Sequence, residues 1–558
     1  MIKKLKVFRP SKYKLKLVAI IRQVEGKKRL SAKKWAQILK MYPKEESGFF
    51  SKSEVIAGYR KFAGKYGLKP FGEKIVELIR MKPIRTLSGV TPVTVLTKPY
   101  SCPGKCIFCP TDVKMPKSYL FAEPGAQRAL RNKFDPYLQT YNRLKAFADI
   151  GHNTSKVELI ILGGTWSFYP EEYQIWFAKR CFEAMSDFAE ATTDKNNFKK
   201  TPKSKVKSEK LAKADWESLF KEQKRNEKAK SRCVGLVVET RPDYISKEEV
   251  IRIRKLGGTK VQIGYQSLKD SVLKANKRGH DVRATKRAMK LLRQAGFKIH
   301  AHWMANLLGS SPKRDVADFK KIFSDKHFRP DELKIYPTSL IESAELVVCY
   351  KSGKWKPYSK AELLEVISKG MLEVPEYCRV TRVIRDFSSD DIVAGNKKTN
   401  FRQIVETKLK KEGKKLKDIR FREIKDERVS FGDLKLKDLT YKTQVGIEVF
   451  LQFVTKSNKI VGFLRLSLPN VKSFIKEIDK SAMIREVHVY GKAVAIGKIR
   501  KGKPQHIGLG KRLIEEAKKR AEKEGFKDLA VISAVGTRIY YRKLGFVDGK
   551  LYQHMGLG

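Results

Sequence analysis

The chain has 558 residues, 41% of them hydrophobic, which is enough to bury two or more cores and excludes a wholly disordered protein. Its 120 Lys and Arg residues against 60 Asp and Glu residues give a formal net charge of +60, which repels itself unless a polyanion binds. We therefore expect a nucleic-acid partner; a membrane surface or a salt-rich cell interior is the alternative, although high salt usually favours acidic chains. No apolar run approaches the roughly 20 residues that span a bilayer, and the first residues lack the features of a signal peptide, so we expect a cytoplasmic protein that does not bind membranes.

Residues 1–90 are strongly basic, with 24 Lys and Arg against 6 Asp and Glu. The stretch Leu30 to Lys40 has a helical period, with Ser31 as the candidate N-cap, and puts apolar residues on one face and lysines on the other. A helical region of this kind can hold phosphates without reading bases, so we predict contact with RNA. The alternative is a helix face that is only solvated.

From residue 91 to 390, short β-branched runs alternate with helical stretches such as Arg283 to Ala295. This alternation predicts a parallel sheet covered by helices, either open or closed into a barrel, with the chemistry in the loops after the strands. The candidate strands are Val93 to Leu96, Val157 to Leu162, Val234 to Glu239, Val261 to Gly264, Ile299 to Met304, Leu333 to Tyr336 and Val380 to Ile384.

Three of the seven cysteines, Cys102, Cys106 and Cys109, lie in the loop after the first candidate strand, with the spacing C-x-x-x-C-x-x-C. Three thiolates can hold three irons of a 4Fe–4S cluster and leave the fourth iron open to chelate a small molecule and pass it an electron. A structural zinc site would need a fourth ligand, and a disulfide framework is not expected in a long chain with few cysteines. The spacing is the signature of the radical S-adenosylmethionine (SAM) enzymes, which the chain resembles here.

Glycine and polar motifs follow several of the other candidate strands. Gly163-Gly164-Thr165 follows the second strand, Glu239 ends the third, and Gln266 follows the fourth. The carboxyl ends of parallel strands share one edge, so these residues are expected to meet the cysteine loop. There, glycines let the backbone approach a ligand, and Glu and Gln can bind amino, hydroxyl and carboxylate groups. We predict that these five residues bind SAM.

Two polar stretches separate the patterned parts of the chain. Residues 191–232 carry 14 Lys and Arg against 6 Asp and Glu, and we expect a partly disordered basic insertion with a short helix, in contact with RNA or with solvent alone. Residues 391–440 are charged and low in apolar content, which predicts a connector between two domains.

Residues 441–558 show a second α/β pattern. Two strand-like runs flank Ser457-Asn458-Lys459, which predicts a hairpin, and Gln505-His506-Ile507-Gly508-Leu509-Gly510-Lys511 opens an amphipathic helix after a further strand. The loop amides and the positive helix end suit a pyrophosphate, whereas a dinucleotide fold would place its glycine motif in an early strand–helix turn. The order of elements resembles the GNAT acetyltransferases. That resemblance implies that Tyr540 and Tyr541 lie near the thioester of acetyl-CoA, as hydrogen-bond donors or general acids.

The combination closely resembles the catalytic subunit of the Elongator complex and its free-standing prokaryotic homologues, the tRNA wobble-uridine carboxymethyl transferases. The resemblance covers nearly the whole chain from about residue 80. It implies a radical-SAM (partial TIM-type) β/α barrel followed by a GNAT α/β domain, with a helical, basic, tRNA-binding N-terminal region. The motifs that carry it include Lys82 to Gly89, Lys98 to Tyr100, the cysteine loop, Arg131 to Tyr137, Glu239 to Tyr244, Arg278 to His280, Leu333 to Thr338, Glu486 to Gly491 and Val535 to Lys543.

Carried over by position, the resemblance implies that Cys102, Cys106 and Cys109 ligate the 4Fe–4S cluster and that Lys156 contacts acetyl-CoA from the radical domain. The acetyl-CoA contacts that it implies in the GNAT domain are Glu486, Val487, His488, Val489, Gln505, Gly508, Leu509, Gly510, Lys511 and Tyr541. Eukaryotic members space the first two cysteines more widely, whereas this chain has the commoner radical-SAM spacing. Many relatives also carry zinc-binding cysteines between the domains; residues 416–423 have none, so a structural zinc is not expected.

The implied reaction forms 5-carboxymethyluridine at the wobble position of tRNA. An electron from the cluster splits SAM, the resulting 5′-deoxyadenosyl radical takes hydrogen from the acetyl methyl group, the carbon radical adds to uridine C5, and the thioester is hydrolysed. The implied partners are the anticodon stem-loop of tRNA and an electron donor that the sequence does not identify; a homodimer or Elongator-like accessory subunits are left open. The alternatives are a conventional lysine or protein N-acetyltransferase with a structural cluster, and a non-catalytic tRNA-binding scaffold.

Overall fold

The computed structural model describes residues 8–45, 48–82, 86, 88–191, 215–425, 429, 431–490 and 508–558. Two predictions fall partly or wholly outside these residues: Gln505 in the pyrophosphate loop, and most of the basic insertion, residues 192–214. None of the described helices combines the length and the apolar character that a bilayer crossing requires.

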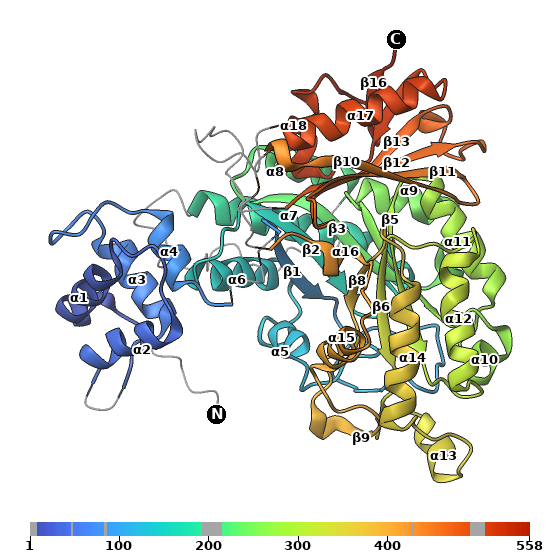
Figure 1. The fold of residues 1–558 in the computed structure, drawn as a ribbon, viewed down its shortest axis with the longest axis horizontal. Helices are drawn as coiled ribbons and strands as arrows, with labels where there is room; N and C mark the ends of the chain where they lie inside the picture. The colour runs from blue at the N-terminus through green and yellow to red at the C-terminus, as the bar shows by residue number, and fades with distance from the viewer. Residues whose placement is uncertain are drawn as a thin grey trace.

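Four helices near the N-terminus form a lobe with its own core, on the left in Figure 1. Ser31 caps the second helix as predicted, because its side chain accepts a hydrogen bond from the Lys34 amide. The lobe meets the rest of the molecule where Arg60 Nη2 donates to the carbonyl of Ala148 at 2.6 Å. The helices are α1 (Lys14–Val24), α2 (Ala32–Met41), α3 (Lys52–Phe62) and α4 (Glu73–Ile79).

The central sheet has seven parallel strands in the order β1-β2-β3-β4-β5-β6-β8. Because β1 and β8 are its two edges, the sheet is an open partial barrel, which decides between the two arrangements that the alternation allowed. All seven predicted strands are confirmed: β1 (Thr91–Leu96), β2 (Lys156–Leu162), β3 (Arg232–Thr240), β4 (Lys260–Gln266), β5 (Lys298–Ala305), β6 (Glu332–Pro337) and β8 (Arg379–Arg382).

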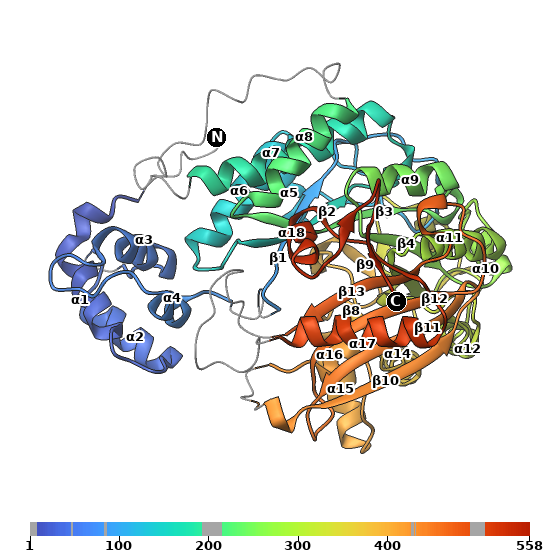
Figure 2. The same ribbon diagram turned by 90° about the horizontal axis from the view of Figure 1, so that it is seen from above.

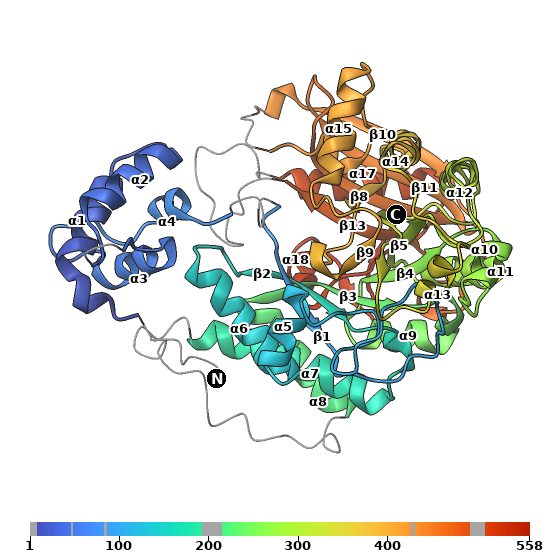
Figure 3. The same ribbon diagram turned by 90° about the horizontal axis from the view of Figure 1, so that it is seen from below.

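Helices cover the outer face of this sheet. Figures 2 and 3 show α6, α7 and α8 grouped near β1 to β3, and α10, α11 and α12 at the other side. The short helix expected in the basic insertion is present as α8. The helices are α5 (Pro124–Arg131), α6 (Pro136–Asp149), α7 (Glu171–Ala191), α8 (Trp216–Lys228), α9 (Lys247–Lys255), α10 (Asp270–Ala275), α11 (Val282–Gln294), α12 (Pro312–Ser324), α13 (Leu346–Lys351), α14 (Lys360–Glu373), α15 (Phe401–Lys411) and α16 (Ile419–Arg422).

A second sheet, at the top in Figure 1, has the order β10-β11-β12-β13-β14-β16-β15, and only β13 and β14 pair in parallel. The predicted hairpin joins β11 to β12, with Asn458 at a φ of 60°. The strand β10 lies largely in the stretch predicted as a connector. The elements are β10 (Lys435–Lys442), β11 (Gly446–Val454), β12 (Ile460–Pro469), β13 (Ala482–Val489), α17 (Leu509–Lys523), β14 (Asp528–Val531), α18 (Arg538–Arg542), β15 (Val547–Asp548) and β16 (Gln553–Gly556).

A buried cluster of charges joins the two sheets. Asp331, just before β6, accepts from Arg485 Nη2 of β13 at 2.6 Å, and Arg465 Nη1 of β12 lies 3.4 Å from it. Arg485 also pairs with Glu448 of β11 at 2.8 Å. Burial alone would raise the pKa of Asp331, but Arg485, Arg465 and Arg293 hold it well below its usual range. The end of the partial barrel at which β6 begins is therefore bound to one face of the second sheet by paired, fully desolvated charges.

Arg485→Met is expected to cost about 3–5 kcal/mol of stability, because it leaves Asp331 and Glu448 buried with too little positive charge. The matched control is Lys437→Met, which removes an ion pair with Glu376 in which the lysine side chain is 43% exposed, and which should cost less than about 1 kcal/mol. Urea unfolding followed by tryptophan fluorescence measures both. Equal shifts of the midpoint would contradict the role assigned to the buried cluster.

Stability should also fall as the pH rises from about 6.5 to 9. Hydrogen bonds from His554 to Asp528 and Glu477 raise its pKa to about 9. A raised pKa stabilises the folded state fully below the unfolded value, near 6.5, and that contribution is lost as the pH passes the folded value. The site is partly screened, so we expect about 1 kcal/mol. The difference in unfolding free energy between wild type and His554→Gln, measured across this range, should shrink with rising pH; a constant difference would contradict the assignment.

Candidate active site

The cysteine loop leaves β1 and is held in place on both sides. The amide of Cys109 donates to the carbonyl of Cys106 at 3.1 Å, which closes a turn, and the amide of Leu346 donates to the carbonyl of Ile107 at 2.8 Å. The Arg241 guanidinium packs against Gly104 so closely that a side chain at this position would have to displace it. The loop therefore presents its three thiols in one fixed conformation at the carboxyl edge of the sheet.

Two guanidinium groups face the thiol of Cys106. Arg278 Nη1 lies 3.3 Å from the Sγ atom and Arg241 Nη1 lies 3.9 Å from it, while Asp243 fixes Arg241 at 2.9 Å. Burial raises the pKa of the Cys109 thiol to about 12, so that thiol stays protonated until a metal replaces its proton. Cationic neighbours favour thiolates, and they would also offset the charge of an anionic centre.

The three cysteines line one cavity of about 180 Å³. No group of three or more His, Cys, Asp or Glu side chains in the described part of the chain is arranged to hold a single metal ion. A cubane cluster asks for something else, since each thiolate binds a different iron. Arg278 Nε and Gln266 Oε1, beside the thiols, are buried and find no hydrogen-bond partner in this structure. Three thiols, compensating cations and unsatisfied polar atoms around one cavity fit a 4Fe–4S cluster.

Four of the five residues predicted to bind SAM line the same cavity: Gly164, Thr165, Glu239 and Gln266. Thr165 Oγ1 lies 3.7 Å from Cys102 Sγ, so this part of the rim directly adjoins the cysteine loop. Gly163 lies behind them: a side chain at this position, where φ is 137°, would collide with Thr97. Gly163 thus permits the ends of β1 and β2 to approach each other closely, and it does not line the cavity.

A larger cavity of about 990 Å³ lies between the barrel and the second sheet, and both contribute to its walls. The structure brings most of the predicted acetyl-CoA residues together here. Those that line it are Lys156, Glu486, Val487, His488, Val489, Gly508, Gly510, Tyr540 and Tyr541. Leu509 is buried beneath the start of α17 and Lys511 is exposed, so neither side chain lines the cavity.

The start of α17 suits an anion. Gly508 is the N-cap residue with a φ of 83°, and as a glycine it has no side chain of its own to cap the first amides of the helix. Free amides at a helix N-terminus carry partial positive charge and bind phosphates well. Across the cavity, Lys156 lies at the start of β2, where burial and the neighbouring Arg232 lower its pKa. An anionic ligand bound between Lys156 and the start of α17 would offset the repulsion between Lys156 and Arg232.

The aromatic and imidazole groups of this cavity are neutral. Burial raises the pKa of Tyr540 and of Tyr541, so both hydroxyls keep their protons and can donate hydrogen bonds. Burial lowers the pKa of His488 to about 4, and its ring stacks on Phe463 with centroids 5.6 Å apart. His488 Nε2 is buried without a hydrogen-bond partner in the described structure.

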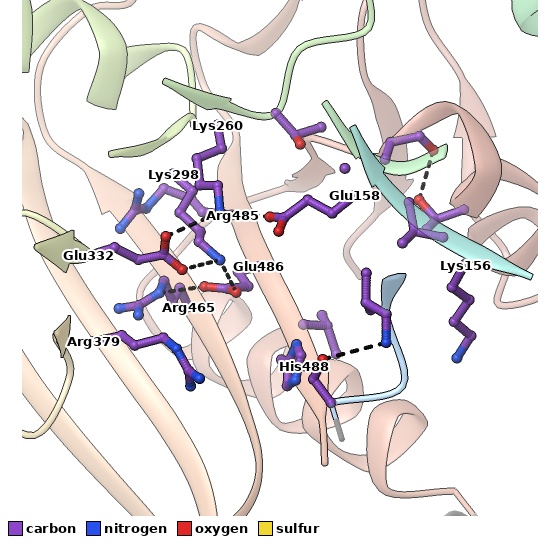
Figure 4. A pocket seen from close by; sticks show the side chains of 18 of the residues that line it. Lys156, Glu158, Lys260, Lys298, Glu332, Arg379, Arg465, Arg485, Glu486 and His488 are labelled. Atoms are coloured by element: carbon purple, nitrogen blue, oxygen red, sulfur yellow. Dashed lines mark hydrogen bonds and ion pairs between the residues drawn. The ribbon is translucent and has the colours of Figure 1, made fainter. Parts of the chain in front are cut away.

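A chain of ion pairs crosses the inner face of the sheet (Figure 4). Lys298 Nζ bridges Glu486 at 2.5 Å and Glu332 at 3.0 Å, and Lys260 Nζ bridges Glu332 at 3.1 Å and Glu158 at 2.6 Å. Apart from Glu486, these residues were not predicted from the sequence. A usable signal was present, because parallel strands buried on both faces are normally apolar, whereas β4, β5 and β6 carry Lys260, Lys298 and Glu332.

The two cavities adjoin. Leu162, Lys334 and Arg382 line both of them. Along β5, Lys298 and His300 line the larger cavity and His302 and Met304 the smaller, so one face of the strand leads from the larger cavity to the cysteine loop. Burial lowers the pKa of both histidines well below the usual range, so this face carries two neutral imidazoles between Lys298 and Met304.

Two family models match the chain: the Radical SAM superfamily over residues 96–319 and the Radical_SAM C-terminal domain over residues 330–411. The chain is 40% identical over 519 residues to the tRNA uridine(34) acetyltransferase of Methanocaldococcus infernus, covering 89% of this chain and 92% of the relative. It is 38% identical over 483 residues to the enzyme of the same name from Dehalococcoides mccartyi, covering 84% and 99%.

More distant relatives match over similar lengths. The chain is 33% identical over 518 residues to human Elongator complex protein 3, covering 87% of this chain and 90% of that protein. Among solved structures, it is similar to the archaeal Methanocaldococcus infernus Elp3 with an N-terminal deletion, with a TM-score of 0.69, 36% identity, and coverage of 84% and 99%.

Cys106→Ala is expected to abolish cluster assembly, because three thiolates are the minimum set that the loop offers. Cys349→Ala is the matched control, since Cys349 is partly buried but lies outside the cavity. Iron and sulfide content and visible absorption after anaerobic reconstitution measure the outcome. A Cys106→Ala protein that retains a full cluster would contradict the assignment of these ligands.

Proposed function

Because this chain belongs to the family of the tRNA uridine(34) acetyltransferases and Elongator complex protein 3, we propose that it modifies uridine 34 of tRNA, forming 5-carboxymethyluridine from acetyl-CoA. The cluster and SAM, when bound, supply the radical that activates the acetyl methyl group. The observation that carries the proposal is the junction of the two cavities at Leu162, Lys334 and Arg382, which puts the predicted acetyl-CoA site and the predicted radical site within reach of one another.

In this proposal the smaller cavity binds the cluster through Cys102, Cys106 and Cys109. Arg278 and Arg241 balance its negative charge and orient the loop. Glu239, Gln266, Gly164 and Thr165 hold SAM against it. Thr165, Arg241 and Arg278 are buried at the carboxyl edge of the sheet, and they would help to keep water from the radical.

The larger cavity binds acetyl-CoA. The amides at the start of α17 hold the pyrophosphate, and Lys156 reaches it from the barrel side. Tyr540 and Tyr541 keep their protons and donate hydrogen bonds toward the thioester or the leaving thiolate. An acetyl group bound there would lie beside the inner face of the sheet, which leads to the smaller cavity.

The tRNA partner is supported by the charge of the chain, most clearly in the N-terminal lobe. A basic helical surface binds phosphates and leaves the base to be read in the cavity, which requires a splayed-out anticodon base. We expect the modification to take place in the cytoplasm. The exposed lysines of the lobe include Lys12, Lys14, Lys16, Lys33, Lys34 and Lys40.

Mass spectrometry of tRNA nucleosides tests the proposal. Reconstituted protein incubated anaerobically with tRNA, SAM, acetyl-CoA and a reductant should form 5-carboxymethyluridine at position 34, and omission of SAM or acetyl-CoA should abolish it. Tyr541→Phe should lower the yield by about tenfold to a hundredfold if its hydroxyl donates a hydrogen bond in the reaction. Acetylation of peptides without SAM, and no modified uridine, would instead favour a conventional N-acetyltransferase and overturn the proposal.

A further inference from the structure

The helix that carries the two cavity tyrosines is anchored outside its own sheet. The carboxylate of Glu227, on the insertion helix α8, is 1% exposed. It lies 3.2 Å from Arg538 Nη1 and 2.8 Å from Arg542 Nη1, and both arginines belong to α18. Figure 1 shows α8 beside α18, although some 310 residues separate them in sequence.

The position of Glu227 is set by the barrel. Asn226, its neighbour, accepts from the Cys233 amide at 2.9 Å and donates to the Ser231 carbonyl at 3.2 Å. Gln223, one turn earlier, donates to the Lys255 carbonyl at 2.9 Å. These three bonds connect the last turn of α8 to β3 and α9, so the Glu227 carboxylate is a fixed point from which α18 can be oriented.

Besides Lys224 of its own helix, 3.9 Å away, the buried carboxylate of Glu227 has two cationic partners on α18, and two partners on one helix define its orientation. Arg538 and Arg542 are four residues apart, so they project from the same face of α18 and straddle Tyr540 and Tyr541. Arg542 also pairs with Asp548 at 2.6 Å, which ties this face to the following turn. Removing the charge of Glu227 would leave Arg542 with Asp548 as its remaining acidic partner and Arg538 without this ion pair, so α18 would lose its ion pairs to α8 while most of the helix would keep its packing.

Tyr540 is the group whose place depends on this. Its hydroxyl packs against Gly510 in the first turn of α17: a Cβ atom added to this glycine would lie only 2.9 Å from the hydroxyl oxygen. Tyr540 and Gly510 both line the larger cavity. The Tyr540 hydroxyl and the amides at the start of α17 therefore border the same part of the larger cavity, and a tilt of α18 would move them apart.

We propose that Glu227 is a positioning residue for acetyl-CoA: through Arg538 and Arg542 it holds Tyr540 over the phosphate-binding start of α17. This inference rests on the proposed function, because it takes acetyl-CoA as the ligand of the larger cavity. In this proposal, the acetyl-CoA site depends both on elements beside the second sheet, α17 and α18, and on the insertion helix α8 of the barrel.

Isothermal titration of acetyl-CoA into the full-length protein tests the inference. Glu227→Gln is expected to raise the dissociation constant about tenfold, while Glu222→Gln leaves it unchanged. Glu222 lies on the same helix and pairs with Arg225 at 3.3 Å, whereas the described ion pairs between α8 and α18 are made by Glu227. SAM binding to the reconstituted protein should be the same in both variants, which separates positioning from general loss of structure.

A second route keeps the test decisive if Glu227→Gln folds poorly. Arg542→Gln removes the partner of Glu227 on α18. The double variant Glu227→Gln/Arg542→Gln should weaken acetyl-CoA binding no more than the stronger of the two single variants, because both residues act through the same ion pair. Unchanged affinity in Glu227→Gln or Arg542→Gln, or equal losses of SAM and acetyl-CoA binding, would overturn the inference. A wild-type protein that does not bind acetyl-CoA would instead overturn the proposed function.

Discussion

The larger cavity, which needs both sheets, depends on the carboxylate of Asp331. This carboxylate accepts a hydrogen bond from the amide of Ile299 at 2.9 Å within the barrel, and it forms an ion pair with Arg485 of the second sheet. The Asp331 side chain is fully buried. Ions in such a place cost several kcal/mol to desolvate, and that cost is offset only when every partner is in position. Two sheets joined by apolar contacts could slide by a residue or two. Sheets joined through Asp331 have one register, and the larger cavity exists only in that register.

The same use of charge explains why the inner face of the sheet is open. In a closed parallel barrel, layers of branched apolar side chains fill the interior. Here Lys260, Lys298 and Glu332 occupy positions on that face and satisfy one another across it. Long charged side chains that pair at their tips line a space and do not fill it. The cost of burial is thus met by mutual pairing, and a continuous path remains between the second sheet and the cysteine loop.

The sequence predicts the elements of the fold better than the contacts between them. Each barrel strand is a local run of β-branched residues, and the cysteine spacing is local too, so both were predictable. The strand β10 was not, because it is an exposed edge strand whose sequence, Lys-Leu-Lys-Asp-Leu-Thr-Tyr-Lys, has the composition of a connector. The pairing of Asp331 with Arg485 spans 154 residues, and no periodicity reports it. Gly163 shows the opposite error: the pattern suggested a ligand contact where the backbone needed room beside Thr97.

The same division between local patterns and long-range contacts applies to the proposed acetyl-CoA site. Its helix-start amides and tyrosines belong to α17 and α18 beside the second sheet, but Lys156 and the anchor of α18 belong to the barrel. A sequence motif can identify each half, because each half is local. The distance between the halves is set by long-range buried charges, and the orientation of α18 by a carboxylate in a segment with the composition of a polar insertion. Insertions in such a barrel are therefore not neutral additions to its surface, since a single buried glutamate in one of them can determine the geometry of a site built on another sheet.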